Sequence, residues 1–204
     1  MDTAEKVDWA ALNAHAAGRP ARRLVGKAIS AAGGDRRPGV VLDLGAGAGA
    51  DSLQFARRGW QVHAYDSDDT LAARLVENER MSGSVTFHHT DIQDVESFPD
   101  AKIVYSTYTL GLLGPEALPQ VWEKLVAALP RGGVMAVDFF GPNDSWAELP
   151  DVATLRFEHL DQGRHVQRVL VREALDVLPH VLAARVDVAR RTEHEGHELP
   201  RRRK

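Results

Sequence analysis

A glycine-rich stretch flanked by carboxylates is the part of this sequence best suited to chemistry. Residues 40–51 read VVLDLGAGAGAD, so that Asp43 lies two positions before Gly45 and Asp51 lies two positions after the last glycine. Glycines let a backbone turn sharply and approach a ligand that a Cβ would exclude. Carboxylates on both sides of such a turn suit a cation better than two phosphates. The stretch therefore predicts a binding loop for a positively charged ligand.

A strand and a helix must position this loop. Residues 40–42 are apolar and partly β-branched, which is typical of a buried parallel strand, and residues 52–58 have helical composition. A strand, a glycine loop and a helix N-terminus together form a cradle for a nucleotide. The spacing G-x-G-x-G differs from the G-x-G-x-x-G of a pyrophosphate-binding turn, and no Lys-Ser or Lys-Thr follows it as in a P-loop.

Two more acids follow predicted strands. Residues 61–66 read QVHAYD, a second strand that ends in Asp66, and residues 85–89 form a third strand that is followed by Asp91. A carboxylate after the second strand of a doubly wound fold can accept hydrogen bonds from both ribose hydroxyls. Each acid alone could simply cap a loop. Acids at three successive strand ends, counting Asp43, favour a single ligand site.

The pattern D-x-G-x-G-x-G-x-D from Asp43 to Asp51 resembles motif I of class I S-adenosylmethionine-dependent methyltransferases. The resemblance implies that the loop holds the methionine part of S-adenosylmethionine, that Asp66 binds the ribose and that Asp91 accepts from the adenine amino group. The product would be S-adenosylhomocysteine. The cofactor-binding residues implied are Asp43, Gly45, Ala46, Gly47, Asp51, Asp66, Ser67, Asp91, Ile92 and Ser106.

A second resemblance lies further along the chain. The turn at residues 130–133 resembles a family signature that precedes the fifth strand, and residues 140–146, FGPNDSW, are similar to a segment of bacterial methyltransferases of the tellurite-resistance and thiopurine group. Together the likeness spans about residues 9–146. Turn chemistry alone is an alternative explanation for residues 141–144. The resemblance implies a small-molecule acceptor that contacts Trp9, Arg19, Tyr108, Phe140, Asp144 and Trp146.

Few reactive groups are expected on the acceptor side of the site, where the candidate catalytic residues are Tyr108 and Asp144. Methyl transfer from a sulfonium is an in-line displacement that mainly needs alignment and exclusion of water, so a neutral amine or a thiolate needs no base. A hydroxyl or carboxyl acceptor would need a general base. Tyr108 is a better candidate for this base than Asp144 or His15, because it follows the fourth strand, residues 103–106. The sequence STYT at residues 106–109 disfavours methylation of nucleic-acid amino groups, because enzymes of that kind carry an Asn/Asp-Pro-Pro-aromatic motif there.

The order of elements predicts an α/β fold: a Rossmann-like, doubly wound and mostly parallel sheet of seven or six strands with an N-terminal helical cap. A single domain is expected, with the cap in residues 1–38, the core in 39–191 and a polar tail in 192–204. Helices are expected over residues 7–15, 21–32, 69–81 and 119–129, with Trp122 on the core side of the last of these.

The last third of the chain allows two interpretations. Apolar positions over residues 166–182 fit a helix, whereas residues 169–171 fit a returning strand. Residues 154–160 and 186–189 have strand patterns. The sheet would therefore end one strand short, or close with a hairpin built from residues 154–171.

Composition bears on several other classes of function. The chain of 204 residues has no cysteine, which excludes disulfides and thiolate nucleophiles, and its histidine spacings do not favour a metal site. A net charge of −4 offers no general attraction to nucleic acid. Without an evident leader or membrane span, we expect a cytoplasmic monomer or homodimer that binds a small-molecule substrate and neither nucleic acid nor a membrane. The alternatives are an NAD-dependent oxidoreductase, disfavoured by the glycine spacing, and a non-methylating relative that binds S-adenosylmethionine.

Overall fold

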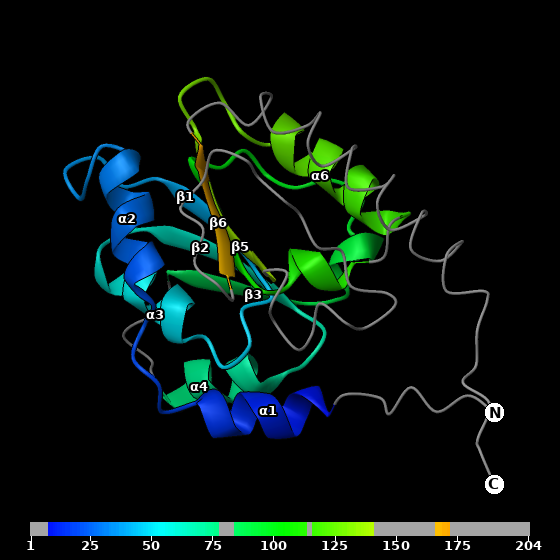
Figure 1. The fold of residues 1–204 in the computed structure, drawn as a ribbon. Coiled ribbons are helices and arrows are strands. Elements are labelled where there is room, and N and C mark those ends of the chain that lie inside the picture. The colour runs from blue at the N-terminus through cyan, green and yellow to red at the C-terminus, as the bar shows by residue number, and fades with distance from the viewer. Residues whose placement is uncertain (1–7, 78–83, 114–115, 141–165, 172–204) are drawn as a thin grey trace, which may run out of the picture.

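The computed structural model describes residues 8–77, 84–113, 116–140 and 166–171 (Figure 1). These residues form a six-stranded sheet in the order β3-β2-β1-β4-β5-β6, with helices on both faces. The strands are β1 (Val40–Leu44), β2 (Gln61–Asp66), β3 (Val85–His89), β4 (Ile103–Thr107), β5 (Val134–Phe140) and β6 (Val166–Val171). The helices are α1 (Trp9–Ala16), α2 (Arg23–Ala31), α3 (Ala50–Arg57), α4 (Thr70–Glu77) and α6 (Ala117–Ala127), with two 3₁₀ turns, η1 (Ile92–Asp94) and η2 (Leu110–Leu112).

The strand order reverses at β1. This strand pairs in parallel with β2 on one side and with β4 on the other, so that Asp43 lies opposite Ala64 and Tyr105. The connections that leave β1 and β4 therefore diverge, and a crevice opens between them at the carboxyl ends of the strands. The predicted α/β class and the mostly parallel sheet are confirmed, because β3 is also parallel to β2 and β5 is parallel to β4.

The strand β6 corrects the helix prediction for part of the C-terminal region. Residues 166–171 pair antiparallel with β5, with Val169 opposite Val137, so the helix expected over 166–182 is wrong for these six residues and the returning strand is right. The segment VQRVLV is rich in β-branched valine, and pairing satisfies the backbone groups along one edge of β5. The predicted strands at 154–160 and 186–189 lie outside the described residues, so a seventh strand stays a prediction.

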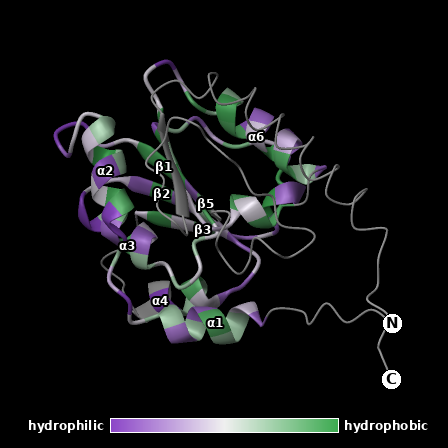
Figure 2. Ribbon diagram, viewed as in Figure 1, coloured by the Kyte–Doolittle hydropathy of each residue, from purple (hydrophilic) through white to green (hydrophobic). Residues whose placement is uncertain are grey.

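Two apolar layers enclose the sheet. Helices α2 and α3 cover one face, where Leu24, Ile29 and Phe55 are fully buried, and α6 covers the other (Figure 1). Figure 2 shows hydrophobic residues on these helices as well as on the strands between them. Trp122 on α6 is fully buried, which confirms its predicted place in the core. Burial of one such side chain contributes roughly 1.5–3 kcal/mol to folding.

The N-terminal helix α1 lies beside α4 rather than in these two layers (Figure 1). Asp8 caps it, because its carboxylate accepts a hydrogen bond from the Ala11 N–H at 2.9 Å. The helix is unusual in its burial, since Leu12 is 46 % exposed whereas Asn13 is only 8 % exposed. Helix α1 therefore turns a polar side chain toward the rest of the protein. Within the described part of the chain, no helix has the length and apolar character needed to cross a membrane.

Candidate active site

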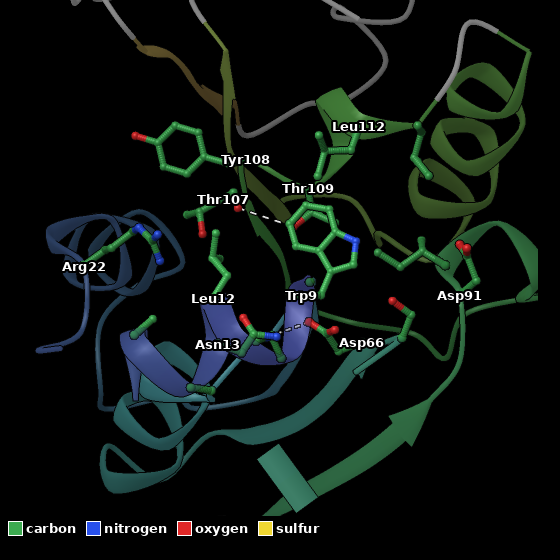
Figure 3. A pocket seen from close by; sticks show the side chains of 18 of the residues that line it. Trp9, Leu12, Asn13, Arg22, Asp66, Asp91, Thr107, Tyr108, Thr109 and Leu112 are labelled. Atoms are coloured by element: carbon green, nitrogen blue, oxygen red, sulfur yellow. Dashed lines mark hydrogen bonds between the residues drawn. The ribbon is translucent and has the colours of Figure 1, made fainter. Parts of the chain in front are cut away.

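A cavity of about 670 Å³ opens at the carboxyl ends of β1, β2 and β4 (Figure 3). Side chains from α1 form one wall, and the segment that follows β4 forms the facing wall. Asp91 and Arg22 lie toward opposite ends of the view. The lining residues are Trp9, Leu12, Asn13, Ala16, Arg19, Arg22, Gly45, Ala46, Gly47, Ala48, Asp66, Ser67, Asp91, Ile92, Thr107, Tyr108, Thr109, Leu112 and Leu113.

The glycine loop enters this cavity with the backbone conformation that its sequence predicts. Gly47 has a φ of 54°, and a Cβ built on it would lie 2.8 Å from the Asn13 Oδ1 atom. Gly45 has a φ of 71°, and a Cβ there would overlap the Thr109 side chain. L-residues rarely adopt positive φ, and neighbouring side chains occupy the space as well, so only glycine fits at these two positions.

Asp66 connects the loop to the end of β2. One carboxylate oxygen accepts the Gly47 N–H at 2.6 Å, and the other accepts the Asp68 N–H at 2.9 Å. Burial raises the pKa of Asp66, although these backbone hydrogen bonds oppose the shift. The carboxylate lines the cavity beside Ser67, where it retains lone pairs for further donors. This placement matches the expected position of a ribose acceptor.

Asp91 and Ile92 line the cavity after β3. The Asp91 carboxylate accepts the backbone N–H and the side-chain amide of Gln93, each at 3.1 Å, which holds it at the start of η1. Ile92 is buried and offers an apolar surface next to it. The predicted adenine-side pair therefore lies in the same cavity as the glycine loop.

Three predicted cofactor residues do not line the cavity. Asp43 is 2 % exposed and accepts a hydrogen bond from the Ser52 hydroxyl beneath the loop. Ser106 is fully buried and donates to the Leu44 carbonyl at 3.1 Å. Asp51, in the first turn of α3, is buried as well. In this geometry these three residues support the loop, and their predicted role as cofactor-binding residues stays a prediction.

Asp51 instead joins α3 to the segment before α2. Arg19 donates to both carboxylate oxygens, at 3.3 and 2.9 Å, and Arg22 donates from its backbone N–H at 2.7 Å and its guanidinium at 3.0 Å. Burial alone would raise the pKa of Asp51, but the hydrogen bonds and charges of the two arginines outweigh it, and the pKa lies below its ordinary value. Arg19 therefore lines the cavity with its guanidinium held by a carboxylate of the protein, and its predicted contact with the substrate stays a prediction.

Tyr108 follows β4 with a strained backbone. Its φ of 65° makes it the one non-glycine residue with positive φ in the described parts of the chain, and its N–H donates to the Asp138 carbonyl at 3.0 Å. The Arg22 guanidinium lies 5.5 Å from the centre of its ring. Strain of this kind persists only where surrounding contacts enforce it, and it concentrates at functional sites.

The remaining predicted acceptor residues divide into two groups. Trp9 lines the cavity from α1, whereas His15 on the same helix is exposed and outside the lining. Phe140 ends β5, but its side chain, together with Asp144 and Trp146, lies outside what the structure describes. The roles of these last three residues stay predictions.

Several lining residues were not predicted from the sequence. Asn13, Leu112 and Leu113 lie in no motif that would mark them, whereas Ala48 lies within the glycine-rich stretch itself. The spacing of Trp9, Asn13 and Ala16 at positions i, i+4 and i+7 does place them on one side of a helix, and this signal could have identified the face of α1 that meets the cavity.

The burial of Asp43 leads to a pH-dependent prediction. Burial, together with the nearby charge of Asp51, raises the pKa of Asp43 from 3.8 to about 7. The stability contributed by protonated Asp43 is fully present below its unfolded pKa and is lost as the pH rises through its folded pKa. Asp43→Asn cannot lose a proton. We therefore expect the fall in unfolding free energy from about pH 5 to about pH 8 to be smaller in this variant, by on the order of 2 kcal/mol.

Urea titrations at the two pH values measure this difference. Asp94→Asn is the control, because Asp94 is an exposed carboxylate on η1, and it should follow the wild type. If Asp43→Asn loses as much stability as the wild type between the two pH values, the proposed proton on Asp43 is wrong.

Three features of the structure indicate the class of fold. They are the reversal of strand order at β1, the glycine loop that follows β1 and the acid at the end of β2. Together they are typical of the fold of class I S-adenosylmethionine-dependent methyltransferases. Residues 41–133 match the family model described as a methyltransferase domain. Residues 41–133, slightly less than half of the chain, therefore resemble a methyltransferase domain both in sequence and in fold, in agreement with the resemblance found in the sequence. The finer likeness to the tellurite-resistance and thiopurine group stays a prediction.

Two curated proteins illustrate the breadth of the similarity. The chain is 33 % identical over 102 residues to a carboxy-S-adenosyl-L-methionine synthase from Aliivibrio fischeri, covering 47 % of this chain and 42 % of the relative. It is 30 % identical over 87 residues to ribosomal RNA small subunit methyltransferase A from Thermotoga petrophila, covering 43 % of this chain and 32 % of the relative. The chain thus spans less than half the length of either protein.

A solved structure extends the likeness to most of the chain. The 1,6-didemethyltoxoflavin-N1-methyltransferase from Burkholderia thailandensis, with bound 1,6-didemethyltoxoflavin and S-adenosylhomocysteine, has a TM-score of 0.55 at 22 % identity. The match covers 80 % of this chain and 65 % of that chain. At this level of identity the likeness concerns the fold.

Proposed function

We propose that this protein transfers the methyl group of S-adenosylmethionine to a small-molecule acceptor by in-line displacement. The observation that carries the proposal is a single cavity that contains the glycine loop, the Asp66 carboxylate and the strained Tyr108. Its volume of about 670 Å³ falls in the range of small-molecule sites. The three features are those needed to bind the cofactor and to present an acceptor to it.

Some residues of the chain would bind S-adenosylmethionine, and others would align the acceptor with its methyl group. S-adenosylmethionine supplies an electrophilic methyl group on a sulfonium. The loop at residues 45–47 would hold its methionine part, Asp66 its ribose, and Asp91 with Ile92 its adenine. Trp9 and Leu112, from facing walls, would exclude water from the reacting centre. An acceptor that is already a neutral amine or a thiolate would need only this alignment.

Tyr108 is the candidate base for a hydroxyl or carboxyl acceptor. It lines the cavity after β4, and the Arg22 guanidinium beside its ring restricts its position. For a hydroxyl acceptor, Tyr108→Phe should lower kcat by about a hundredfold, the lower end of the contribution of a positioned general base. Affinity for S-adenosylhomocysteine should stay within about twofold of wild type, because the phenol oxygen is assigned to the acceptor and not to the cofactor.

Steady-state kinetics combined with calorimetry measure both quantities for Tyr108→Phe. An unchanged kcat with a hydroxyl acceptor removes Tyr108 from the reaction. A parallel loss of cofactor affinity instead places the side chain in the cofactor site.

The acceptor is proposed to be compact and partly apolar. Leu12, Leu112 and Leu113 add apolar surface to Trp9 and Tyr108 around the cavity. The net charge of −4 and the sequence STYT after β4 do not favour a nucleic-acid acceptor, although one of the curated relatives is named as a ribosomal RNA methyltransferase. Asp144 and Trp146 remain candidates for acceptor contacts. A cytoplasmic monomer or homodimer is still the expected form.

A panel of small metabolites, RNA and protein substrates tests the acceptor class. The proposal expects a product heavier by one methylene group, together with S-adenosylhomocysteine, from a small molecule. Robust incorporation of methyl groups into RNA or protein would overturn the substrate class.

A non-methylating use of the same cofactor is the second candidate function. It is favoured by the similarity to carboxy-S-adenosyl-L-methionine synthase, whose name describes a modified form of the cofactor as its product. Mass spectrometry of the nucleoside products separates the two functions, because methyl transfer yields S-adenosylhomocysteine and modification of the cofactor does not. An NAD-dependent oxidoreductase is disfavoured by the glycine spacing and by the match to a methyltransferase domain.

A further inference from the structure

Asn13 is a buried polar residue that no motif explains. It lies on the cavity side of α1 and is 8 % exposed. Its side-chain amide nitrogen donates a hydrogen bond to the Asp68 carboxylate at 3.0 Å, which joins α1 to the turn before α4. A side chain that served only to attach α1 would need no more than this one bond.

The orientation of the amide follows from its partner. An ionised carboxylate accepts hydrogen bonds and donates none, so the NH₂ group of Asn13 must face Asp68, and its Oδ1 atom faces the other way. That direction leads to the glycine loop, since a Cβ on Gly47 would lie 2.8 Å from Oδ1. No hydrogen bond to Oδ1 occurs among the described residues of the chain. An oriented acceptor therefore stands over the loop at the edge of the cavity.

A chain of hydrogen bonds fixes the Asn13 Oδ1 atom relative to the glycine loop. Asp68 accepts from Asn13 and donates its backbone N–H to Asp66 at 2.9 Å, and Asp66 in turn accepts the Gly47 N–H at 2.6 Å. The Asn13 Oδ1 atom lies beside Gly47, so the contacts lead from α1 through the two aspartates and back to the loop next to Asn13. Because the acceptor is held before any ligand arrives, little side-chain entropy would be lost on binding. The carboxylates of Asp66 and Asp68 also make this corner favourable for positive charge.

We propose that Asn13 Oδ1 accepts a hydrogen bond from the α-ammonium group of S-adenosylmethionine. The inference rests on the proposed function, in which the loop at residues 45–47 holds the methionine part of that molecule. An ammonium carries three N–H donors and a positive charge, so it matches a lone oriented acceptor between carboxylates. Helix α1 then contributes directly to recognition of the amino-acid end of the cofactor, in addition to forming a wall of the cavity.

Calorimetric titration of Asn13→Ala with two ligands tests the proposal. The ligands are S-adenosylhomocysteine and its deaminated analogue, in which hydrogen replaces the α-amino group. The variant should lose about tenfold or more in affinity for S-adenosylhomocysteine, the range of a charge-assisted hydrogen bond, while its affinity for the analogue stays within about twofold of wild type. His15→Ala is the matched control, because His15 is on the same helix, exposed and outside the cavity.

The ligand pair distinguishes a contact from a structural role. If Asn13→Ala weakens both ligands equally, Asn13 acts through the position of α1 and the proposal is wrong. If neither ligand is weakened, the proposal is also wrong. A wild-type protein that binds neither ligand would instead contradict the proposed function itself, so the two failures are separate results.

Discussion

Gly47→Val should abolish measurable binding of S-adenosylmethionine, a loss of more than about a hundredfold in affinity. The wild-type residue has a φ of 54°, and a Cβ would lie 2.8 Å from Asn13 Oδ1, so a branched side chain must displace α1 or occupy the space of the ligand. The Gly47 N–H also donates to Asp66. A distortion of the loop at Gly47 would therefore displace Asp66, the predicted ribose acceptor. We expect the variant to remain folded, at a stability cost of about 1 to 2 kcal/mol for the left-handed backbone.

Calorimetry measures the affinity, and thermal unfolding followed by circular dichroism verifies the fold. Gly132→Val is a matched control, because Gly132 also has positive φ, at 79°, with nothing within 4 Å of its Cβ position. It precedes β5 at the amino ends of the strands, so the control should lose stability without losing affinity. A folded Gly47→Val protein with wild-type affinity would show that the loop is not the binding site.

Asp66→Ala is expected to weaken S-adenosylhomocysteine binding by about 1.5 to 3 kcal/mol, the range for hydrogen bonds to a charged group. The carboxylate lines the cavity and has lone pairs left after its two backbone hydrogen bonds. Asp94→Ala removes an exposed carboxylate outside the cavity and should leave affinity unchanged. A loss of only a few tenths of a kcal/mol in Asp66→Ala would show that this acid does not hold the ribose.

A pH series provides an independent test of Asp66. Burial raises the pKa of its carboxyl group, so protonation sets in at a higher pH than for an exposed aspartate. The ionised form is the stronger acceptor. Affinity in the wild type should therefore fall as the pH is lowered toward this raised pKa, and Asp66→Ala should show a flatter dependence over the same range.

The main features of the nucleotide site were predictable from sequence because they depend on local spacing. Gly45 and Gly47 come directly after β1. Asp66 is the last residue of β2, and Asp91 follows β3. Parallel strands bring their carboxyl ends to one edge of the sheet. Residues in these positions therefore lie close together, independently of how the rest of the chain folds. The α/β class followed from the same alternation of strand and helix.

The direction of a side chain could not be predicted from the spacing of residues. Asp43, Asp51 and Ser106 are near the loop in sequence or register, and their side chains are buried. They bond to Ser52, to the cavity-lining Arg19 and Arg22, and to the Leu44 carbonyl, respectively. Spacing places a residue at an edge of the sheet. Which way its side chain turns depends on the packing of the layers above and below.

Long-range pairing was decided by the tertiary structure alone. Residues 166–171 have apolar positions that suit a helix as well as a strand, and the edge of β5 selected the strand because it offered backbone partners. Arg19 meets Asp51 across 32 positions of sequence, and Asn13 meets Asp68 across 55. The sequence by itself determined the loop, the acids and the fold class through spacings of a few residues. The wall of the cavity that α1 builds exists only because folding brings distant charges and amides within bonding distance.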